Sequence, residues 1–198
     1  NYEELQRVLQ NLRDAEHTIS MTQGVYDMLH IGHARYLEKA KSLGDILVVA
    51  VDTDEYTRKR KQKANERRPV VPFQERLELL ANLRCVDILT IRDLAEHEAD
   101  PDFVIKVVKP DALVMSRSTS DVSSAKHDEL RALLALHGGR LEVLEPQAST
   151  STTQTIRELF MDGAGGLVDH IIDAIETYFH KENRQVSFGH REKEGKKE

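Results

Sequence analysis

Apolar residues along the chain follow two different spacings. Near the start they recur at intervals of three and four residues, so residues 2–16 are predicted to form an amphipathic helix. Residues 46–51, by contrast, form a continuous apolar run of strand length. Such a run is typical of a parallel strand that is covered on both faces. The two spacings together predict a protein in which helices pack on a sheet.

The same two patterns alternate along most of the sequence. Further strands are predicted at residues 18–22, 86–91, 112–115 and 141–144. Helices are predicted at residues 30–42, 73–83, 101–108, 125–137 and 153–161, and a polar helix or loop at residues 54–66. Strands that alternate with helices indicate βαβ units. The expected fold is therefore α/β, a Rossmann-like doubly wound parallel sheet with flanking N- and C-terminal helices.

Composition divides the chain into segments. We expect an N-terminal helix at residues 1–16 and a main domain at residues 17–161, followed by a C-terminal helix at residues 162–180 that begins in a Gly-rich hinge. Residues 181–198 are charged and poor in apolar side chains, which is typical of a disordered tail. The flanking helices are expected to mediate dimerisation, giving a homodimer, or to cover the site.

Charge and cysteine content narrow the range of functions. The chain has 28 basic and 34 acidic residues, a formal net charge of −6, which argues against a dedicated nucleic-acid binder. Cys85 is the only cysteine, so no internal disulfide supports secretion. No apolar run approaches the roughly 20 residues of a membrane span. We expect a soluble, cytoplasmic protein with no membrane or nucleic-acid partner.

Two histidines, His30 and His33, open the helix that follows the first predicted strand. Their spacing puts both imidazoles on neighbouring positions of one helical face. Gly32 leaves room for a ligand to approach the backbone, and a helix N-terminus favours phosphate. In an open parallel sheet, the ligand site lies beyond the carboxyl ends of the strands. The segment therefore predicts a site where two imidazoles stabilise charge on a phosphoryl group.

Other interpretations remain open for these residues. The two histidines could bind a metal such as zinc together with Asp27, or they could be idle and exposed. Residues 58–68 are rich in Lys and Arg and are either a solvated loop, an anion site or a nucleic-acid contact. Ser151 to Thr153 are either a plain helix cap or phosphate ligands.

The segment from Gly24 to His33 resembles the signature of the cytidylyltransferase-like nucleotidyltransferases, G-x-[FY]-D-x-x-H-x-G-H after the first strand. The resemblance extends over roughly residues 17–160, through Lys61 and residues 67–76 to a Ser/Thr cluster at residues 149–153. It implies a Rossmann-like fold with an HxGH motif. The implied reaction is attack by a substrate phosphate on the α-phosphorus of a nucleoside triphosphate, with release of pyrophosphate and with Mg²⁺ bridging triphosphate oxygens.

The resemblance also implies roles for individual residues. The catalytic residues would be His30, His33 and Lys61. The nucleotide-binding residues would be Gly24, Val25, Tyr26, Asp27, Gly32, Ser151, Thr152 and Thr153. Asp27, Arg117 and Asp121 are candidates for binding the acceptor. No residues are assigned as dedicated metal ligands.

The stretch before the Ser/Thr cluster bears on the choice of nucleotide. Members that use CTP, such as glycerol-3-phosphate cytidylyltransferase, often carry R-T-E-G there, whereas residues 146–149 of this chain lack the arginine. Members that resemble heptose-1-phosphate adenylyltransferase lack it too. The resemblance therefore favours ATP over CTP, with a phosphorylated sugar or alcohol as acceptor. The alternatives are a cytidylyltransferase acting on glycerol-3-phosphate or another phosphoalcohol, and a nucleotide-sensing module without turnover.

Overall fold

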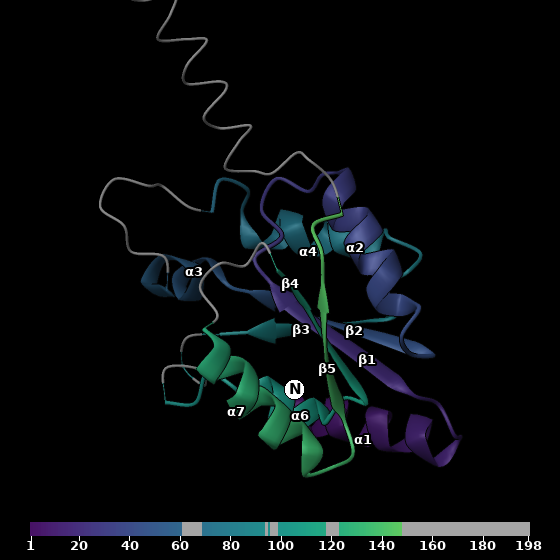
Figure 1. The fold of residues 1–198 in the computed structure, drawn as a ribbon. Helices are drawn as coiled ribbons and strands as arrows, with labels where there is room; N and C mark the ends of the chain where they lie inside the picture. Colours follow the sequence, from purple (N-terminus) through teal and green to yellow (C-terminus); the bar gives the residue numbers. More distant parts are fainter. Residues whose placement is uncertain (61–68, 94, 96–98, 118–122, 148–198) are drawn as a thin grey trace, which may run out of the picture. The chain divides into compact units, whose positions relative to one another are not determined.

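The computed structural model describes residues 1–60, 69–93, 95, 99–117 and 123–147 (Figure 1). Three site residues or groups named above lie outside the described residues: Lys61, Asp121 and Ser151 to Thr153. The helices expected at residues 153–161 and 162–180 and the tail expected at residues 181–198 also lie outside them.

Within the described residues, five parallel strands form one sheet in the order β3-β2-β1-β4-β5. They are β1 (Ile19–Gly24), β2 (Ile46–Asp52), β3 (Ile88–Arg92), β4 (Ala112–Ser116) and β5 (Arg140–Leu144). At the centre, Met21 of β1 is in register with Val48 of β2 and with Leu113 of β4. The predicted parallel α/β sheet is confirmed, with every strand close to its expected position.

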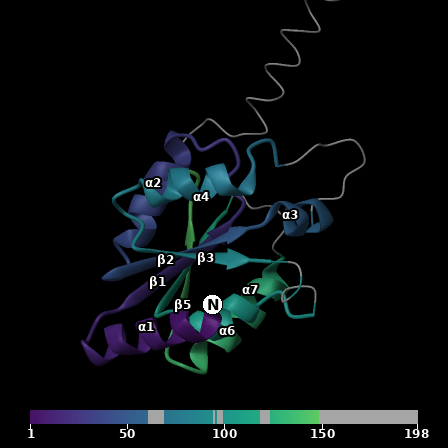
Figure 2. The same cartoon turned by 180° about the vertical axis from the view of Figure 1, so that it is seen from behind.

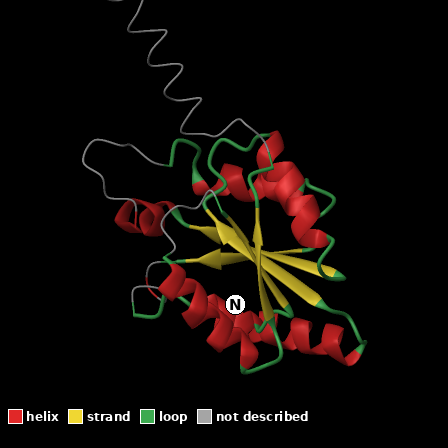
Figure 3. Cartoon of the chain, in the orientation of Figure 1, coloured by secondary structure: helices red, strands yellow, loops and turns green. Residues whose placement is uncertain are grey.

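Helices cover both faces of the sheet (Figures 1 and 2). One face carries α2 (Ile31–Lys41) and α4 (Phe73–Ala81), and the other carries α1 (Tyr2–Asp14), α6 (Phe103–Val108) and α7 (Ser124–Ala135). A short helix, α3 (Asp54–Arg60), follows β2. Figure 3 shows the sheet between these two layers. The arrangement is doubly wound, because each face of the sheet buries its apolar side chains under helices.

The N-terminal helix α1 is part of the main hydrophobic core. Leu9 is fully buried among Met21, Val48 and neighbouring apolar side chains. Arg13 donates to the carbonyl oxygen of Val108 at 2.6 Å, which ties the end of α1 to the end of α6. The helix therefore stabilises the sheet on the face opposite α2. None of the described helices is long and apolar enough to cross a membrane.

Gly44 lies between α2 and β2 and has a packing role. A Cβ at this position would lie 2.6 Å from the backbone nitrogen of Ser20. Any larger residue would therefore push the start of β2 away from β1. The close approach allows the strand that follows α2 to enter the sheet beside β1, in register from Ile19 and Ile46 onward.

The order of the strands reverses beside β1. The chain places β2 and β3 on one side of β1, then returns to place β4 and β5 on the other side. In an open parallel sheet, ligands bind beyond the carboxyl ends of the strands that flank such a reversal. Here these ends are Gly24 of β1 and Ser116 of β4, and the loop after Gly24 leads to His30 and His33.

Candidate active site

His30 and His33 lie together at the start of α2. The centroids of their rings are 4.0 Å apart, with the ring planes tilted by 35°. His30 is the N-cap residue, and its Nδ1 accepts a hydrogen bond from the backbone N–H of Gly32 at 3.1 Å. The Nδ1 of His33 accepts from the backbone N–H of His30 at 3.4 Å. Each ring is thus held by the backbone of the same helical turn.

These hydrogen bonds decide which ring nitrogens face a ligand. A neutral imidazole whose Nδ1 accepts a hydrogen bond carries its proton on Nε2. Both histidines therefore keep an Nε2–H donor that the backbone does not use. The backbone N–H groups at the start of α2 are partly occupied, because Gly32 donates to His30 and the N–H of His33 donates to the carbonyl of His30 at 2.9 Å. The imidazoles, rather than these two amides, present donors to a phosphate.

His33 lies in an environment that favours its neutral form. The pKa of His33 is lowered to about 4, mainly by burial and also by the neighbouring His30, while Asp27 opposes the shift. At neutral pH His33 is uncharged and acts as a hydrogen-bond donor through Nε2. A neutral donor can stabilise charge that develops during a reaction without contributing a proton.

A chain of hydrogen-bonded hydroxyl groups holds the tyrosine ring that packs against His33. The Tyr26 and His33 rings pack edge-on with their centroids 5.7 Å apart, and the Tyr26 hydroxyl donates to Thr22 Oγ1 at 3.3 Å. Thr22 Oγ1 lies 2.7 Å from the hydroxyl of Tyr36, which donates to the carbonyl of Val114 at 2.9 Å. Since the single Tyr36 proton is directed to Val114, Thr22 donates to Tyr36. The chain joins α2 to both β1 and β4.

Burial raises the pKa of Tyr36 to about 12, so its hydroxyl stays protonated at neutral pH. Neither Thr22 nor Tyr36 was predicted from the sequence to belong to the site. The sequence contains an indication for Tyr36, because it follows His33 by three residues and precedes the apolar Leu37 and Ala40 on the same helix. A hydroxyl in such a position requires a buried partner.

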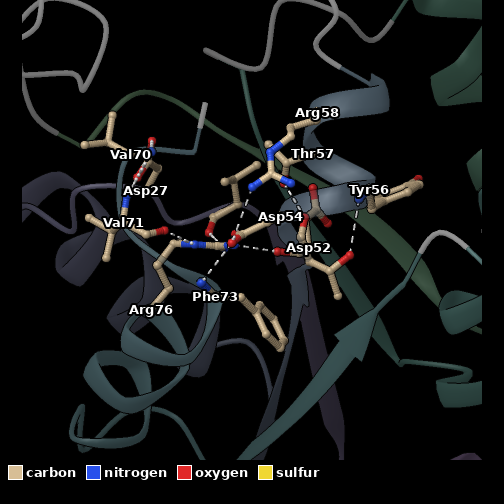
Figure 4. A network of polar contacts seen from close by, with 12 residues as sticks. Asp27, Asp52, Asp54, Tyr56, Thr57, Arg58, Val70, Val71, Phe73 and Arg76 are labelled. Carbon is tan, nitrogen blue, oxygen red and sulfur yellow. Dashed lines mark hydrogen bonds and ion pairs between the residues drawn. The ribbon is translucent and has the colours of Figure 1, made fainter. Parts of the chain in front are cut away.

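The predicted nucleotide-binding residues in the loop are mostly buried. Val25 and Tyr26 belong to the core, so either could touch a nucleotide only through its main chain. The carboxylate of Asp27 is also buried, and it accepts hydrogen bonds from the backbone N–H groups of Val70 and Val71 at 2.9 to 3.1 Å (Figure 4). In this structure Asp27 therefore joins the loop between β1 and α2 (residues 25–30, the histidine loop) to the segment before α4. Its contact with a ligand stays a prediction.

Arg117 follows β4, the strand beside β1, and is exposed. Its guanidinium pairs with Glu145 at 2.7 Å, and both side chains are more than half exposed to solvent. An exposed pair of this kind contributes little free energy, about 0–1 kcal/mol. The guanidinium can therefore exchange Glu145 for an anionic ligand at small cost.

Within the described residues, no group of three or more His, Cys, Asp or Glu side chains is placed to hold a metal ion. The zinc interpretation of the two histidines depended on Asp27 as a further ligand. Both oxygens of the Asp27 carboxylate instead receive backbone hydrogen bonds.

Residues 21–158 match the family model described as cytidylyltransferase-like. The bifunctional protein HldE from Alkalilimnicola ehrlichii is 38% identical over 156 residues, which cover 79% of this chain and 30% of the relative. HldE from Syntrophotalea carbinolica is 34% identical over 157 residues, with the same coverage of each chain. This chain therefore spans about three tenths of the length of these relatives.

A solved structure agrees with the fold. The lipopolysaccharide core biosynthesis protein from Thermoplasma volcanium superimposes with a TM-score of 0.51 at 29% sequence identity. The match covers 66% of this chain and 96% of that protein. Nearly the whole of the shorter protein thus corresponds to the α/β unit described above.

Proposed function

Because the chain belongs to the cytidylyltransferase-like family, we propose that it transfers a nucleoside monophosphate from a nucleoside triphosphate to a sugar phosphate, releasing pyrophosphate. The observation that carries the proposal is the arrangement of His30 and His33. The Nδ1 atom of each imidazole accepts a hydrogen bond from the backbone, so each ring keeps an Nε2–H donor beyond the carboxyl end of β1. Two imidazole N–H donors at the reversal of strand order suit a triphosphate.

The proposed reaction needs little proton transfer. A phosphate monoester, whose second pKa is about 6, is already mostly a dianion at neutral pH. One of its oxygens attacks the α-phosphorus, and the bond between the α-phosphorus and the bridging oxygen breaks as pyrophosphate leaves with the electron pair. The Nε2–H groups of His30 and His33 donate to the α- and β-phosphate oxygens as charge builds on them. No base is required, which agrees with the pKa of His33 near 4.

Other groups in the proposal come from the family resemblance. Lys61 would neutralise the incoming phosphate, and Ser151, Thr152 and Thr153 would hold the leaving pyrophosphate. Mg²⁺, when bound, would neutralise charge on the triphosphate.

A sugar phosphate is preferred as acceptor for two reasons. The HldE relatives match 79% of this chain, and a structural relative is named for lipopolysaccharide core biosynthesis. Arg117, at the end of β4, offers a guanidinium to an anionic acceptor through its weak pair with Glu145. Asp27 is a less direct candidate, since its carboxylate is engaged by Val70 and Val71. Asp121 lies outside the described residues and stays a prediction.

For the nucleotide we propose ATP in preference to CTP, because residues 146–149 lack the arginine seen in many CTP-using members. Thermal unfolding with Mg²⁺ and either nucleotide tests this choice. A ligand at about 100 times its Kd stabilises the folded state by about 2.7 kcal/mol. Stabilisation by CTP but not by ATP would reverse the assignment.

Pyrophosphate release, measured over a panel of sugar phosphates and phosphoalcohols with each nucleotide, tests the activity itself. Release that depends on a sugar phosphate supports the proposal, whereas release only with glycerol-3-phosphate and CTP supports the alternative cytidylyltransferase. Tight nucleotide binding without turnover on any acceptor would favour a nucleotide-sensing module instead.

A further inference from the structure

A buried arginine on α4 connects several segments around the histidine loop. The side chain of Arg76 is 1% exposed. Its guanidinium donates to three backbone carbonyls, those of Val25, Val71 and Asp52, the last two at 3.0 Å. It also pairs with the carboxylate of Asp54 at 2.7 Å (Figure 4). Burying a guanidinium is costly unless its N–H groups are satisfied, so this side chain is held by a dedicated set of acceptors.

Two of these contacts lead to the loop between β1 and α2. The contact with Val25 reaches that loop directly. The contact with Val71 reaches it through one more link, because the N–H of Val71 donates to Asp27 at 2.9 Å. Arg76 and Asp27 thus bind opposite sides of residue 71, one through its carbonyl and the other through its N–H. These hydrogen bonds run from Val25 through Arg76 and Val71 to Asp27, and the main chain from residue 25 to residue 27 closes the ring.

This ring encloses a strained residue. Tyr26 has a φ of 53° and Met28 a φ of 48°, values in the left-handed region that residues other than glycine avoid. Such a conformation costs on the order of 1–2 kcal/mol for each residue and persists only where the surroundings impose it. Val25 and Asp27, the two anchored residues, flank Tyr26. The Tyr26 ring in turn contacts His33 at 5.7 Å.

We propose that Arg76 is a positioning residue that, together with Asp27, holds the strained loop at Tyr26 and thereby fixes the orientation of His30 and His33. Its effect on turnover rests on the function proposed above, whereas its effect on the two imidazoles does not. Arg76 acts through the loop and not on a ligand, since its guanidinium is buried and bonded to protein acceptors.

Arg92 provides a matched control. It is also buried, with 3% exposure, and it donates to Asp52 and to the hydroxyl of Tyr56, each at 3.0 Å. These partners lie on β2 and α3 and not in the histidine loop, although Asp52 is shared, since its backbone carbonyl also accepts from Arg76. A variant of Arg92 therefore reports the general cost of disturbing a buried guanidinium in this sheet.

The substitution Arg76→Lys keeps a positive charge but cannot bridge acceptors as the planar guanidinium does. The test compares wild type, Arg76→Lys and Arg92→Lys, each shown to be folded by its thermal unfolding transition. Long-range ¹⁵N–¹H spectra of the free proteins report the imidazole tautomers and the pKa of His33. We expect Nε2–H tautomers in wild type and in Arg92→Lys. In Arg76→Lys we expect mixed tautomers and a His33 pKa that returns toward 6.5, by at least about one unit.

Turnover gives a second measurement. In Arg76→Lys, kcat should fall by about 10- to 100-fold with a smaller change in KM for the nucleotide, as expected when reacting groups are slightly misplaced. Unchanged imidazole signals and unchanged kcat in a folded Arg76→Lys would overturn the proposal. Equal changes in the Arg92→Lys protein would also overturn it, since they would indicate general destabilisation.

The role of Arg76 can still be decided if wild type shows no turnover or if Arg76→Lys does not fold. If wild type shows no turnover, the proposed function fails while the imidazole spectra still decide the role of Arg76. If Arg76→Lys does not fold, hydrogen exchange in wild type decides. The N–H groups of Val70 and Val71 should be protected as strongly as those of the core strands. Exchange at the rate of an open chain would exclude the ring of hydrogen bonds.

Discussion

The backbone N–H of His30 donates to Nδ1 of His33 at 3.4 Å, and the centroids of the two rings are 4.0 Å apart. This hydrogen bond orients the His33 ring through the main chain of His30. It leaves Nε2–H of each ring as the donor for a ligand. The helix cap and the predicted phosphate-binding group are therefore the same pair of side chains.

The first prediction concerns the donor at His33. The substitution His33→Ala should lower kcat by at least about 100-fold, the scale of losing one hydrogen-bond donor to a transition state. Steady-state kinetics of pyrophosphate release measure the effect. His17→Ala is the control, because His17 is exposed and precedes β1 at the end of the strand away from the loop. Equal activity of the two variants would remove His33 from the mechanism.

The second prediction concerns pH. In the folded protein the pKa of His33 is lowered from 6.5 to about 4, mainly by burial. The unfolded chain therefore binds a proton between these values that the folded protein does not, and stability falls as the pH falls through this window. Urea unfolding between pH 7 and pH 4 should show the decline in wild type. His33→Gln should show a shallower decline, and parallel curves would contradict the prediction.

The third prediction concerns the hydroxyl chain behind His33. Tyr36→Phe removes the donor to Val114 and leaves Thr22 without its acceptor, which should cost about 1–3 kcal/mol of unfolding free energy. Tyr2→Phe is the control, because the Tyr2 hydroxyl donates to the carbonyl of Ile91 in an exposed position. Chemical denaturation measures both. A smaller loss for Tyr36→Phe than for Tyr2→Phe would show that the buried chain contributes little.

The fourth prediction tests whether α1 belongs to the core. Leu9→Ala should destabilise the protein by about 2–5 kcal/mol, because the side chain is fully buried and its loss leaves a cavity. Val8→Ala, at a neighbouring position that is 40% exposed, should change stability much less. Thermal or urea unfolding compares them. Similar small losses in both variants would mean that α1 is dispensable for the fold.

The order of the described elements followed from the sequence alone, and so did the type of each except α3, for which the sequence left a polar helix or a loop open. The apolar run at residues 46–51 predicts a buried strand whatever surrounds it, and the helical spacing near Leu9 predicts an amphipathic helix. The histidine spacing and the family signature predicted a candidate site at the start of α2 after β1, and its ligand-binding role stays a prediction. These features are local, because the periodicity of a helix or strand and the residues of a motif lie close together along the chain.

What holds the site together was decided by the tertiary structure. Arg76 meets Val25, which lies 51 positions away in sequence, and Tyr36 meets Val114, which lies 78 positions away. The sequence shows a charged residue and a hydroxyl on helices that also carry apolar side chains, but not their acceptors. Acceptors become fixed only when the sheet brings the ends of β1, β2 and β4 together. The chemistry at His30 and His33 is therefore local in sequence, while their orientation depends on contacts made by folding.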